Sequence, residues 1–395
     1  MRIYIVPAWY PQNDDDINAV FFREQAQALA KQGYDITVLH IKPISVTNVF
    51  KKPWHQIRHW QDGKVRTVFH KVIVPIPGKL NGIQEKYISN LYYKVIKKQI
   101  EEDKKVGLVP PDILHAHVSH SCGYYCLKTA DKLGLPLIVT EHYSGLLLGT
   151  ATSREHQRVK ETIEKSNGFI FVGSNFQKKL CEKLKIKKTT YVIPNMVDSF
   201  FFEEIKAEET KKQPFTFLVA CHLKKNKSVD LVINAFHNTF QKQEPVRLIV
   251  AGDGEELQAL KKLVANLREE DRISFYGKYS RQQGKELFST ANAFVLTSKV
   301  ETFGIVYLEA LASGIPCIAT KGQGGDDIIN DTNGFLVEYG DESQLCLAMR
   351  QLYENRNRYN KDLIQKDCQA RFSEETICKR LENIYKIGLA KLEEN

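Results

Sequence analysis

Short apolar runs rich in β-branched residues alternate with longer segments of helical periodicity along the first half of the chain. The helical segment Val20–Lys31, for example, separates two such runs and stops before Gly33. Repeated alternation of this kind predicts a parallel sheet covered by helices on both faces. The predicted strands are Arg2–Val6, Asp35–Ile41, Ile113–Ala116, Leu137–Thr140, Gly168–Val172 and Tyr191–Ile193.

The alternation breaks at Pro194–Pro214, where a turn is followed by the charged run Glu203–Lys212, and we interpret this stretch as a linker. A second series of units follows, with predicted strands at Phe215–Ala220, Val246–Ala251, Arg272–Phe275, Ala293–Thr297 and Pro316–Ala319. Its predicted helices are Val229–Thr239, Glu255–Arg268, Arg281–Ser289 and Ile305–Ser313, and a long amphipathic helix, Glu374–Glu393, forms the tail. The pattern predicts an α/β protein with two doubly wound, Rossmann-like domains facing a central cleft, because open sheets bind ligands at the carboxyl ends of their strands.

The composition agrees with a soluble globular protein of two domains: 395 residues, 43% hydrophobic and 26% charged. No apolar run reaches the roughly 18 residues of a membrane helix, and the N-terminus reads as a buried strand, so we expect a cytoplasmic protein. Eight scattered cysteines without a CxxC pair favour core thiols. Cys122 and Cys126, with His117 and His120, are the less favoured metal-site alternative. The net charge of +9 favours anionic partners.

Residues 301–316 carry the strongest chemical signal, E-T-F-G-I-V-Y-L-E-A-L-A-S-G-I-P. A loop holding Glu301 and Gly304 leads into a helix, whose N-terminal N–H groups can bind a diphosphate. Gly304 allows the backbone to approach a ligand closely. Glu309 lies inside an apolar helical run, where a carboxylate needs a partner, and vicinal ribose hydroxyls are a suitable one. A solvated Glu301 and a lysine-paired Glu309 are the structural alternative.

This segment resembles the Glu-x7-Glu signature, E-G-F-G-x-x-x-L-E-A-x-A-x-G-x-P, of retaining glycosyltransferases with the GT-B fold, specifically glycosyltransferase family four. Other family marks follow in order: Tyr191-Val-Ile-Pro-Asn195, Ala251-Gly-Asp-Gly254, Phe275-Tyr-Gly277, Gly324-Gly325 and Asn333-Gly334. The resemblance implies an N-terminal acceptor-side domain, 1–196, joined by the C-terminal helix at about 374–395. It implies a C-terminal donor-binding domain at 197–373.

The resemblance also implies roles for individual residues. Glu301 and nearby backbone N–H groups would hold the donor sugar and diphosphate, Glu309 the ribose, and Lys227 would neutralise the diphosphate. His142, in Thr140-Glu-His142, matches the family histidine near the donor sugar, although a structural histidine is an equal alternative; we expect His115 to be structural. The implied catalytic residues are Glu301, His142 and Lys227. The implied donor-binding residues are His222, Lys227, Glu301, Thr302, Phe303, Gly304, Ile305, Val306, Glu309 and Gly277.

Two positions depart from the family pattern. His222 stands where an arginine usually helps the lysine, so either Lys224 or Lys225 compensates or diphosphate binding is weaker. The first loop lacks the usual glycine and carries Asp14–Asp16, three carboxylates that would repel a diphosphate and that we expect to face solvent or the acceptor.

The resemblance implies a retaining transferase that moves a sugar from a nucleotide-diphosphate sugar to a hydroxyl acceptor, a glycan or lipid-linked glycan in surface polysaccharide synthesis. No Ser/His/Asp or Cys/His constellation indicates a protein nucleophile, so positioning and electrostatics remain, and we expect no metal and no other cofactor. The alternatives are a sugar-nucleotide epimerase or phosphorylase on the same fold, and a non-catalytic nucleotide-sugar-binding protein.

Lysines cluster at Tyr92–Lys105 and Lys178–Lys188. In the first cluster they interleave with apolar residues, which is typical of a basic amphipathic helix on an anionic membrane. A solvated helix that packs its apolar side inward is the slightly favoured alternative. We therefore expect a cytoplasmic protein with an anionic membrane surface, on the inner face, as an optional peripheral partner, and no nucleic-acid partner.

Overall fold

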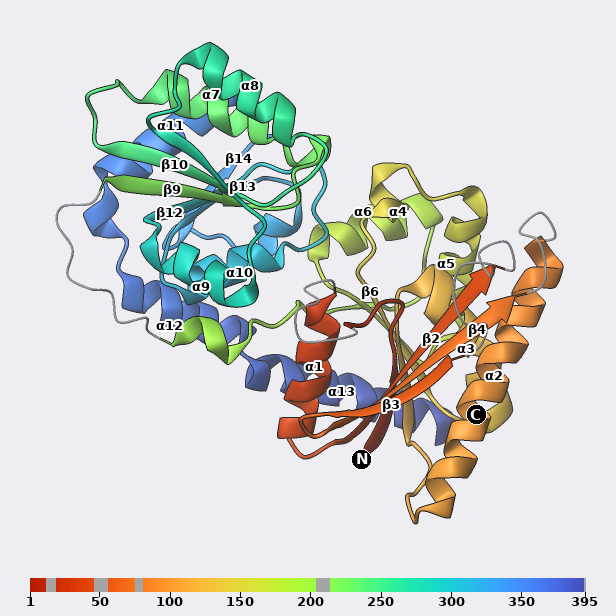
Figure 1. The fold of residues 1–395 in the computed structure, drawn as a ribbon. Helices are drawn as coiled ribbons and strands as arrows, with labels where there is room; N and C mark the ends of the chain where they lie inside the picture. Colours follow the sequence, from red (N-terminus) through yellow and green to blue (C-terminus); the bar gives the residue numbers. More distant parts are fainter. Residues whose placement is uncertain (12–18, 46–55, 75–80, 204–213, 394–395) are drawn as a thin grey trace. The chain divides into compact units, whose positions relative to one another are not determined.

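The computed structural model describes residues 1–11, 19–45, 56–74, 81–203 and 214–393 of the chain (Figure 1). The chain divides into two compact units. The first comprises Met1–Val172, Gln177–Pro194 and Ile377–Asn395, and the second comprises Gly173–Phe176 and Asn195–Thr376. Each unit is built on its own, largely parallel sheet, so the predicted α/β class with two Rossmann-like domains is confirmed.

The sheet of the first unit has the order β3-β4-β2-β1-β5-β6-β7-β8 within the described residues. Its strands are β1 (Arg2–Val6), β2 (Asp35–Ser45), β3 (Gln56–Asp62), β4 (Val65–Val74), β5 (Ile113–His117), β6 (Leu137–Glu141), β7 (Gly168–Phe171) and β8 (Tyr191–Val192). The sequence did not predict β3 and β4, and β3 runs antiparallel to β4 at the sheet edge. The direction of strand addition reverses between β1 and β5, which are paired neighbours, and this places a topological switch point there.

Helices cover both faces of this sheet (Figure 1). They are α1 (Val20–Lys31), α2 (Asn81–Lys105), α3 (Tyr124–Leu133), α4 (Gly145–Leu148), α5 (Ser153–Lys165), the later part of α6 (Ser174–Leu184) and α13 (Glu374–Glu393). Successive side chains of β6 point to opposite faces of the sheet. A Cβ on Gly388 of α13 would contact Ile138, and a Cβ on Gly123, next to α3, would contact Val139, so α13 and α3 lie on opposite faces. The last helix therefore completes the core of the first unit.

The second unit has the strand order β11-β10-β9-β12-β13-β14 in the described residues, again with a switch point, here between β9 and β12. The strands are β9 (Phe215–Ala220), β10 (Val246–Ala251), β11 (Ile273–Gly277), β12 (Ala293–Leu296), β13 (Cys317–Thr320) and β14 (Gly334–Val337). The described strands of this sheet pair in parallel. The sequence analysis did not predict β14, because a strand of four residues that begins with a glycine shows no alternation of polar and apolar positions.

Two helical layers enclose the second sheet (Figure 1). On one face lie α7 (Val229–Thr239), α8 (Leu257–Leu267) and α11 (Glu342–Glu354), and on the other lie α9 (Arg281–Thr290), α10 (Ile305–Ala312) and α12 (Lys361–Phe372). Short 3-10 turns η3 (Ser199–Phe202), η4 (Lys225–Lys227) and η5 (Gly324–Asp327) come after strands, and η6 (Arg356–Arg358) follows α11. Leu218 of β9 and Leu296 of β12 are fully or almost fully buried, so the carboxyl ends of these strands emerge from a dry core.

No helix among the described residues is both long and apolar enough to cross a lipid bilayer. All eight cysteines fall in the described ranges and are free thiols. Cys122 and Cys126 are buried, and Cys122 Sγ lies 3.3 Å from the Tyr92 hydroxyl. Burial raises the pKa of the Cys122 thiol to about 11. These two thiols behave as core groups, and no cluster of metal-ligating side chains occurs in the described ranges.

Candidate functional site

Two loops meet at the switch point of the second sheet. One follows β9 and contains η4, and the other follows β12 and leads to α10. The N–H of Lys299 donates to the carbonyl of Asn226 over 2.8 Å, which ties the two loops together. The carboxyl edge at a switch point is where open α/β sheets bind ligands. The loops that carry Lys227 and Glu301 therefore occupy the expected place for a nucleotide.

Lys227 and Glu301 form an ion pair, with 2.7 Å between Lys227 Nζ and Glu301 Oε2. Both side chains are mostly shielded, with 19% and 15% of their surface exposed. Burial by itself lowers the pKa of Lys227, but the Glu301 carboxylate and its hydrogen bond outweigh burial, and the pKa is raised. The ammonium group therefore stays charged at neutral pH, close to the edge where an anionic ligand would arrive.

The start of α10 presents backbone N–H groups at this edge. Gly304 precedes the helix with φ of 92°, a left-handed conformation that favours glycine, and no side chain caps the helix. Thr302, Phe303 and Gly304 are buried, whereas Ile305 and Val306 are partly exposed. An uncapped helix N-terminus with its partial positive charge is suited to a phosphate group.

Close backbone packing fixes the Glu301 loop. A Cβ on Gly324 would lie 2.3 Å from the Phe303 Cα atom, and one on Gly173 would lie 2.4 Å from the Thr302 carbonyl oxygen. The N–H of Gly324 donates to the Glu301 carbonyl over 2.9 Å, and the Glu301 N–H donates to Gln323 Oε1 over 3.3 Å. The loop is therefore pre-organised by its neighbours, a requirement for electrostatic catalysis.

His222 is exposed, and its Nδ1 lies 2.7 Å from the carbonyl oxygen of Asp253. A carbonyl can only accept, so Nδ1 carries the proton, and the neutral ring has a lone pair on Nε2. His222 can therefore donate to a phosphate through Nε2 only when the imidazole is protonated. The Lys224 and Lys225 side chains are exposed on the same loop.

Glu309 lies on α10 and is partly exposed, not buried as the apolar run around it suggested. Burial raises the pKa of Tyr279, and the charge of Glu309 adds to the effect, which places the carboxylate near that phenol. Gly277 ends β11 with φ of 84°, and its carbonyl accepts a 2.8 Å hydrogen bond from the Gly252 N–H. Both predicted residues therefore belong to the second unit, on elements that end at or begin from its carboxyl edge.

In the first unit, His115 and His117 lie in the last part of β5, and His142 directly follows β6. His117 Nδ1 lies 3.1 Å from His142 Nε2. His115 is fully buried and satisfied at both nitrogens, 2.8 Å from the Tyr385 hydroxyl and 2.8 Å from Thr140 Oγ1, so its expected structural role is confirmed. Burial lowers the pKa of His115 and of His142 to about 3, so both rings are neutral at pH 7.

Sequence reasoning missed two residues that hold these loops. Gln323 binds the Glu301 backbone, and Glu141 binds the backbone on both sides of the histidine pair. Glu141 was visible in Thr140-Glu-His142, and its position next to a predicted site histidine was the available signal. Nothing in the sequence around Gln323 indicated that its side chain contacts the backbone of Glu301, 22 positions earlier. The predicted Asp14–Asp16 loop lies outside the described residues.

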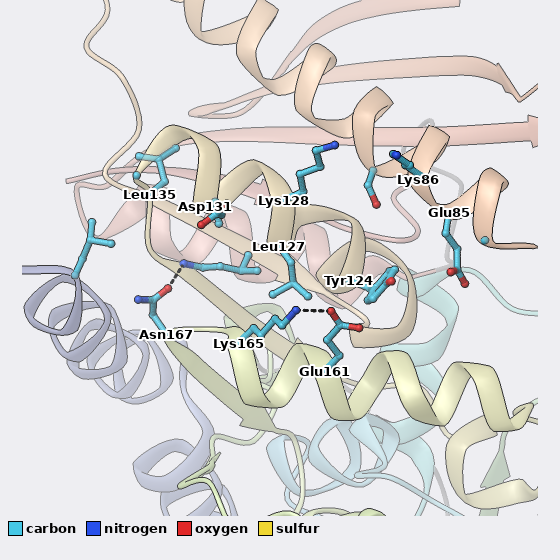
Figure 2. A pocket seen from close by; sticks show the side chains of 16 residues that line it. Glu85, Lys86, Tyr124, Leu127, Lys128, Asp131, Leu135, Glu161, Lys165 and Asn167 are labelled. Carbon is cyan, nitrogen blue, oxygen red and sulfur yellow. Dashed lines mark hydrogen bonds and ion pairs between the residues drawn. The ribbon is translucent and has the colours of Figure 1, made fainter. Parts of the chain in front are cut away.

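The first unit also has a hollow of about 760 Å³ between α2, α3 and α5 (Figure 2). Its labelled charged residues have both signs, and Lys165 pairs with Glu161 at 2.6 Å (Figure 2). Leu137 and Asn167, which line it, begin β6 and precede β7, so the hollow lies at the amino ends of these strands. It is therefore separate from the edge that carries His142.

Two protein-family models match consecutive parts of the chain. The model of Glycosyltransferase Family 4 matches residues 19–199, and that of Glycosyl transferases group 1 matches residues 201–367. The chain is 27% identical to N-acetyl-alpha-D-glucosaminyl L-malate synthase of Bacillus anthracis, over 69% of this chain and 74% of that protein. It is 28% identical to alpha-monoglucosyldiacylglycerol synthase of Streptococcus pneumoniae, over 63% of this chain and 60% of that protein.

A similar solved structure is that of Anabaena HepE in complex with UDP. It superposes with a TM-score of 0.70 at 15% identity and covers 97% of this chain and 99% of that one. At this identity the likeness concerns the fold. Together with the two family models, it accounts for almost the whole chain.

Proposed function

The chain belongs to the family four and group 1 glycosyltransferases with the GT-B fold, and from this we propose that it transfers a sugar from a nucleoside diphosphate sugar to a hydroxyl acceptor. The observation that carries the proposal is the Lys227–Glu301 pair, 2.7 Å apart at a switch point and beside the uncapped start of α10. A cation and a helix N-terminus together suit a diphosphate, and an adjacent carboxylate suits a sugar hydroxyl.

We assign the donor-binding roles on the same basis. Lys227 and the N–H groups from Thr302 to Val306 bind the diphosphate, Glu301 binds the sugar, and Glu309 binds the ribose hydroxyls. His222 adds a phosphate contact when it is protonated. Gly277 lines the nucleobase end, and His142 contacts the donor sugar, as its place in the family pattern implies.

The proposed reaction retains the anomeric configuration. The acceptor oxygen bonds to the anomeric carbon on the face from which the diphosphate oxygen departs, and the acceptor proton passes to that departing oxygen. The protein positions the partners and stabilises the charge on the leaving diphosphate through Lys227 and the α10 N-terminus. We propose that this needs no metal. NMR of the product anomer and turnover in excess EDTA test both statements; an inverted product contradicts the first, and lost turnover contradicts the second.

A thermal-shift screen of nucleoside diphosphates and their sugars identifies the donor. A ligand that binds only the folded state at about 100 times its Kd adds about 2.7 kcal/mol of stability, a shift that is easily measured. Product analysis then separates the alternatives. A transferase releases nucleoside diphosphate only as an acceptor is glycosylated. An epimerase changes the sugar nucleotide without an acceptor, a phosphorylase needs phosphate, and a binding protein shows no turnover.

We also propose that the acceptor is a glycan or lipid-linked glycan in surface polysaccharide synthesis, made at the inner face of the membrane. The Streptococcus pneumoniae relative, by its name, makes a glycolipid. In α2, Tyr92, Val95 and Ile96 are buried, so attachment there rests on exposed lysines and not on inserted apolar residues. Pelleting with anionic liposomes at low salt but not at high salt supports this. Pelleting that does not depend on lipid charge or on salt concentration contradicts electrostatic attachment to the membrane.

A further inference from the structure

The carboxylate of Glu141 bridges the two loops that carry the histidine pair of the first unit. It is fully buried. Its Oε2 accepts hydrogen bonds from the N–H of Ser119, at 2.9 Å, and from the Ser119 hydroxyl. Its Oε1 accepts from the N–H of His142, at 2.8 Å, and from that of Tyr143, at 2.7 Å. One side chain therefore joins the end of β5 to the end of β6.

The backbone is strained where this bridge attaches. Val118, between His117 and Ser119, has φ of 75° and ψ of 103°, a region that a β-branched residue rarely adopts. A single π-helical turn, Ser119–Gly123, follows it. Strained residues and π-helical turns concentrate at functional sites and persist only where the surroundings hold them. The Glu141–Ser119 contacts hold this turn together with the Val118 N–H, which donates to the Thr140 carbonyl over 2.9 Å, and the Thr162 hydroxyl, which donates to the Ser119 carbonyl over 3.2 Å.

The ring of His142 is constrained from two further sides. His117 is fully buried, and its Nδ1 bonds to His142 Nε2, whereas its own Nε2 makes no hydrogen bond in the described part of the chain. The rings of Phe21 and Phe22 pack against the His142 ring at centroid distances of 5.1 and 5.0 Å. His117 therefore has His142 as its hydrogen-bond partner. The orientation of the His142 ring depends on how Glu141 fixes the two loops relative to each other.

A buried carboxylate does not by itself indicate that the folded state is stabilised, because apolar residues of similar volume often stabilise a protein core equally well. Glu141 could only be replaced in this way if Ser119, His142 and Tyr143 found other acceptors for their N–H groups. Each of those groups lies in a loop that begins where a strand ends, at the edge that carries the site. The carboxylate therefore stabilises the two loops and does not serve to fill the hydrophobic core.

We propose that Glu141 is a positioning residue for His142: by clamping the loop after β5 to the loop after β6, it fixes the orientation of the imidazole and the hydrogen bond with His117. The proposal rests on the proposed function in one respect, that His142 contacts the donor sugar. Glu141 itself acts through the backbone and touches no substrate. A misplacement of about 1 Å at such a contact can reduce turnover by about 100-fold.

The test compares Glu141→Gln and Ser119→Ala with Asp103→Asn in the full chain. Glutamine keeps the shape of Glu141, but its NH₂ group must face N–H donors on one side. Asp103 is a matched control: it is a buried carboxylate of the same unit, bonded to Arg2, Tyr4 and Gln99. Arg2 begins β1, so Asp103 lies toward the amino ends of the strands and not at the edge that carries the histidine loops. Kinetics with the nucleotide sugar found by thermal shift give kcat and KM separately.

We expect Glu141→Gln to reduce kcat by about 10- to 100-fold with less than about a threefold change in the donor KM, and Ser119→Ala to act in the same direction by about two- to fivefold. Asp103→Asn should lower the melting temperature while kcat stays within about twofold. Wild-type kcat in Glu141→Gln, or a kcat that follows melting temperature in all three variants, would overturn the proposal.

A second measurement does not depend on turnover. Side-chain ¹⁵N spectra of histidine-labelled protein, with His142 assigned by loss of its signals in His142→Gln, report the tautomer of that ring. The wild type should show one dominant tautomer, and Glu141→Gln should show a mixture, with Asp103→Asn like the wild type. An unchanged His142 signal in Glu141→Gln overturns the positioning role. Absence of turnover with every nucleotide sugar tests the proposed function instead and leaves this spectrum interpretable.

Discussion

Removing the carboxylate of Glu301 should make a nucleoside diphosphate bind more tightly, although it should abolish most transfer. In the second unit, Glu301 Oε2 lies 2.7 Å from Lys227 Nζ. A diphosphate that reaches Lys227 must compete with this carboxylate and then lie beside it. Glu301→Gln removes the competition and the repulsion and leaves the Lys227 cation in place.

The magnitude follows from the geometry. Two unit charges 2.7 Å apart attract by about 6 kcal/mol at an effective dielectric constant of about 20. Desolvation and side-chain ordering offset most of this, and a net coupling of about 1–2 kcal/mol is reasonable for a pair that is neither exposed nor fully buried. We therefore expect Glu301→Gln to tighten diphosphate binding by about 5- to 30-fold. Lys227→Ala removes charge-assisted hydrogen bonds worth about 1.5–3 kcal/mol and should weaken binding by about 10- to 150-fold.

Isothermal titration calorimetry of the two single variants and the double variant closes a double-mutant cycle. Glu338→Gln is the matched control, since Glu338 pairs with Lys321 at 3.0 Å in the same unit, but both side chains are more than half exposed. This control should change the diphosphate affinity by less than about twofold. If Glu301→Gln weakens binding as Lys227→Ala does, or if the coupling energy is below about 0.5 kcal/mol, the competition described above is wrong.

Three further predictions concern neighbouring features. Glu309→Ala should weaken nucleoside diphosphate binding by about 10- to 100-fold, and titration of a 2′,3′-dideoxy analogue should show little difference between variant and wild type; equal losses would exclude the ribose role. Gly324→Ala, whose Cβ would lie 2.3 Å from Phe303 backbone atoms, should lower diphosphate affinity and cost about 1–3 kcal/mol in urea unfolding. Gly322→Ala, with open space around it but φ of 74°, should also lower stability through backbone strain but should spare affinity. Burial lowers the pKa of His115 to about 3, below its unfolded value of about 6.5, so acidification protonates the unfolded chain first and stability is lost as pH falls from about 6.5 toward 3. Between pH 7 and pH 5 this amounts to about 2 kcal/mol, and a flat urea midpoint over that range would contradict it.

The fold was largely predictable because most strands of both sheets are short, continuous apolar runs separated by helices of clear periodicity. Two kinds of strand were not predicted from the sequence. The edge strand β3 and its neighbour β4 mix charged and apolar residues, and β14 is too short to show a pattern. Local sequence carries little information where pairing with a distant strand decides the structure.

Part of the candidate site could likewise be predicted from the sequence. The Glu301–Pro316 segment was predictable, because a glycine, a helix start and two carboxylates lie within one short segment. The Lys227–Glu301 ion pair was not, since it joins residues 74 positions apart across a switch point. Glu309 was expected to be buried among apolar neighbours, yet it is partly exposed, because a helix that packs on the face of a sheet buries only part of its own surface. The Glu141 bridge depends on two loops whose proximity only the sheet order reveals.

The most direct test of the central claim is a turnover measurement in the full chain with the nucleotide sugar selected by thermal shift. A mixture of alkyl glycosides and lipid extract serves as the acceptor pool, and nucleoside diphosphate released is counted against glycosylated product. We predict one diphosphate per glycosylated acceptor in the wild type, and a rate at least about 100-fold lower in Glu301→Ala at saturating donor. Wild-type turnover in both Glu301→Ala and Glu309→Ala, or sugar-nucleotide conversion without any acceptor product, would contradict it.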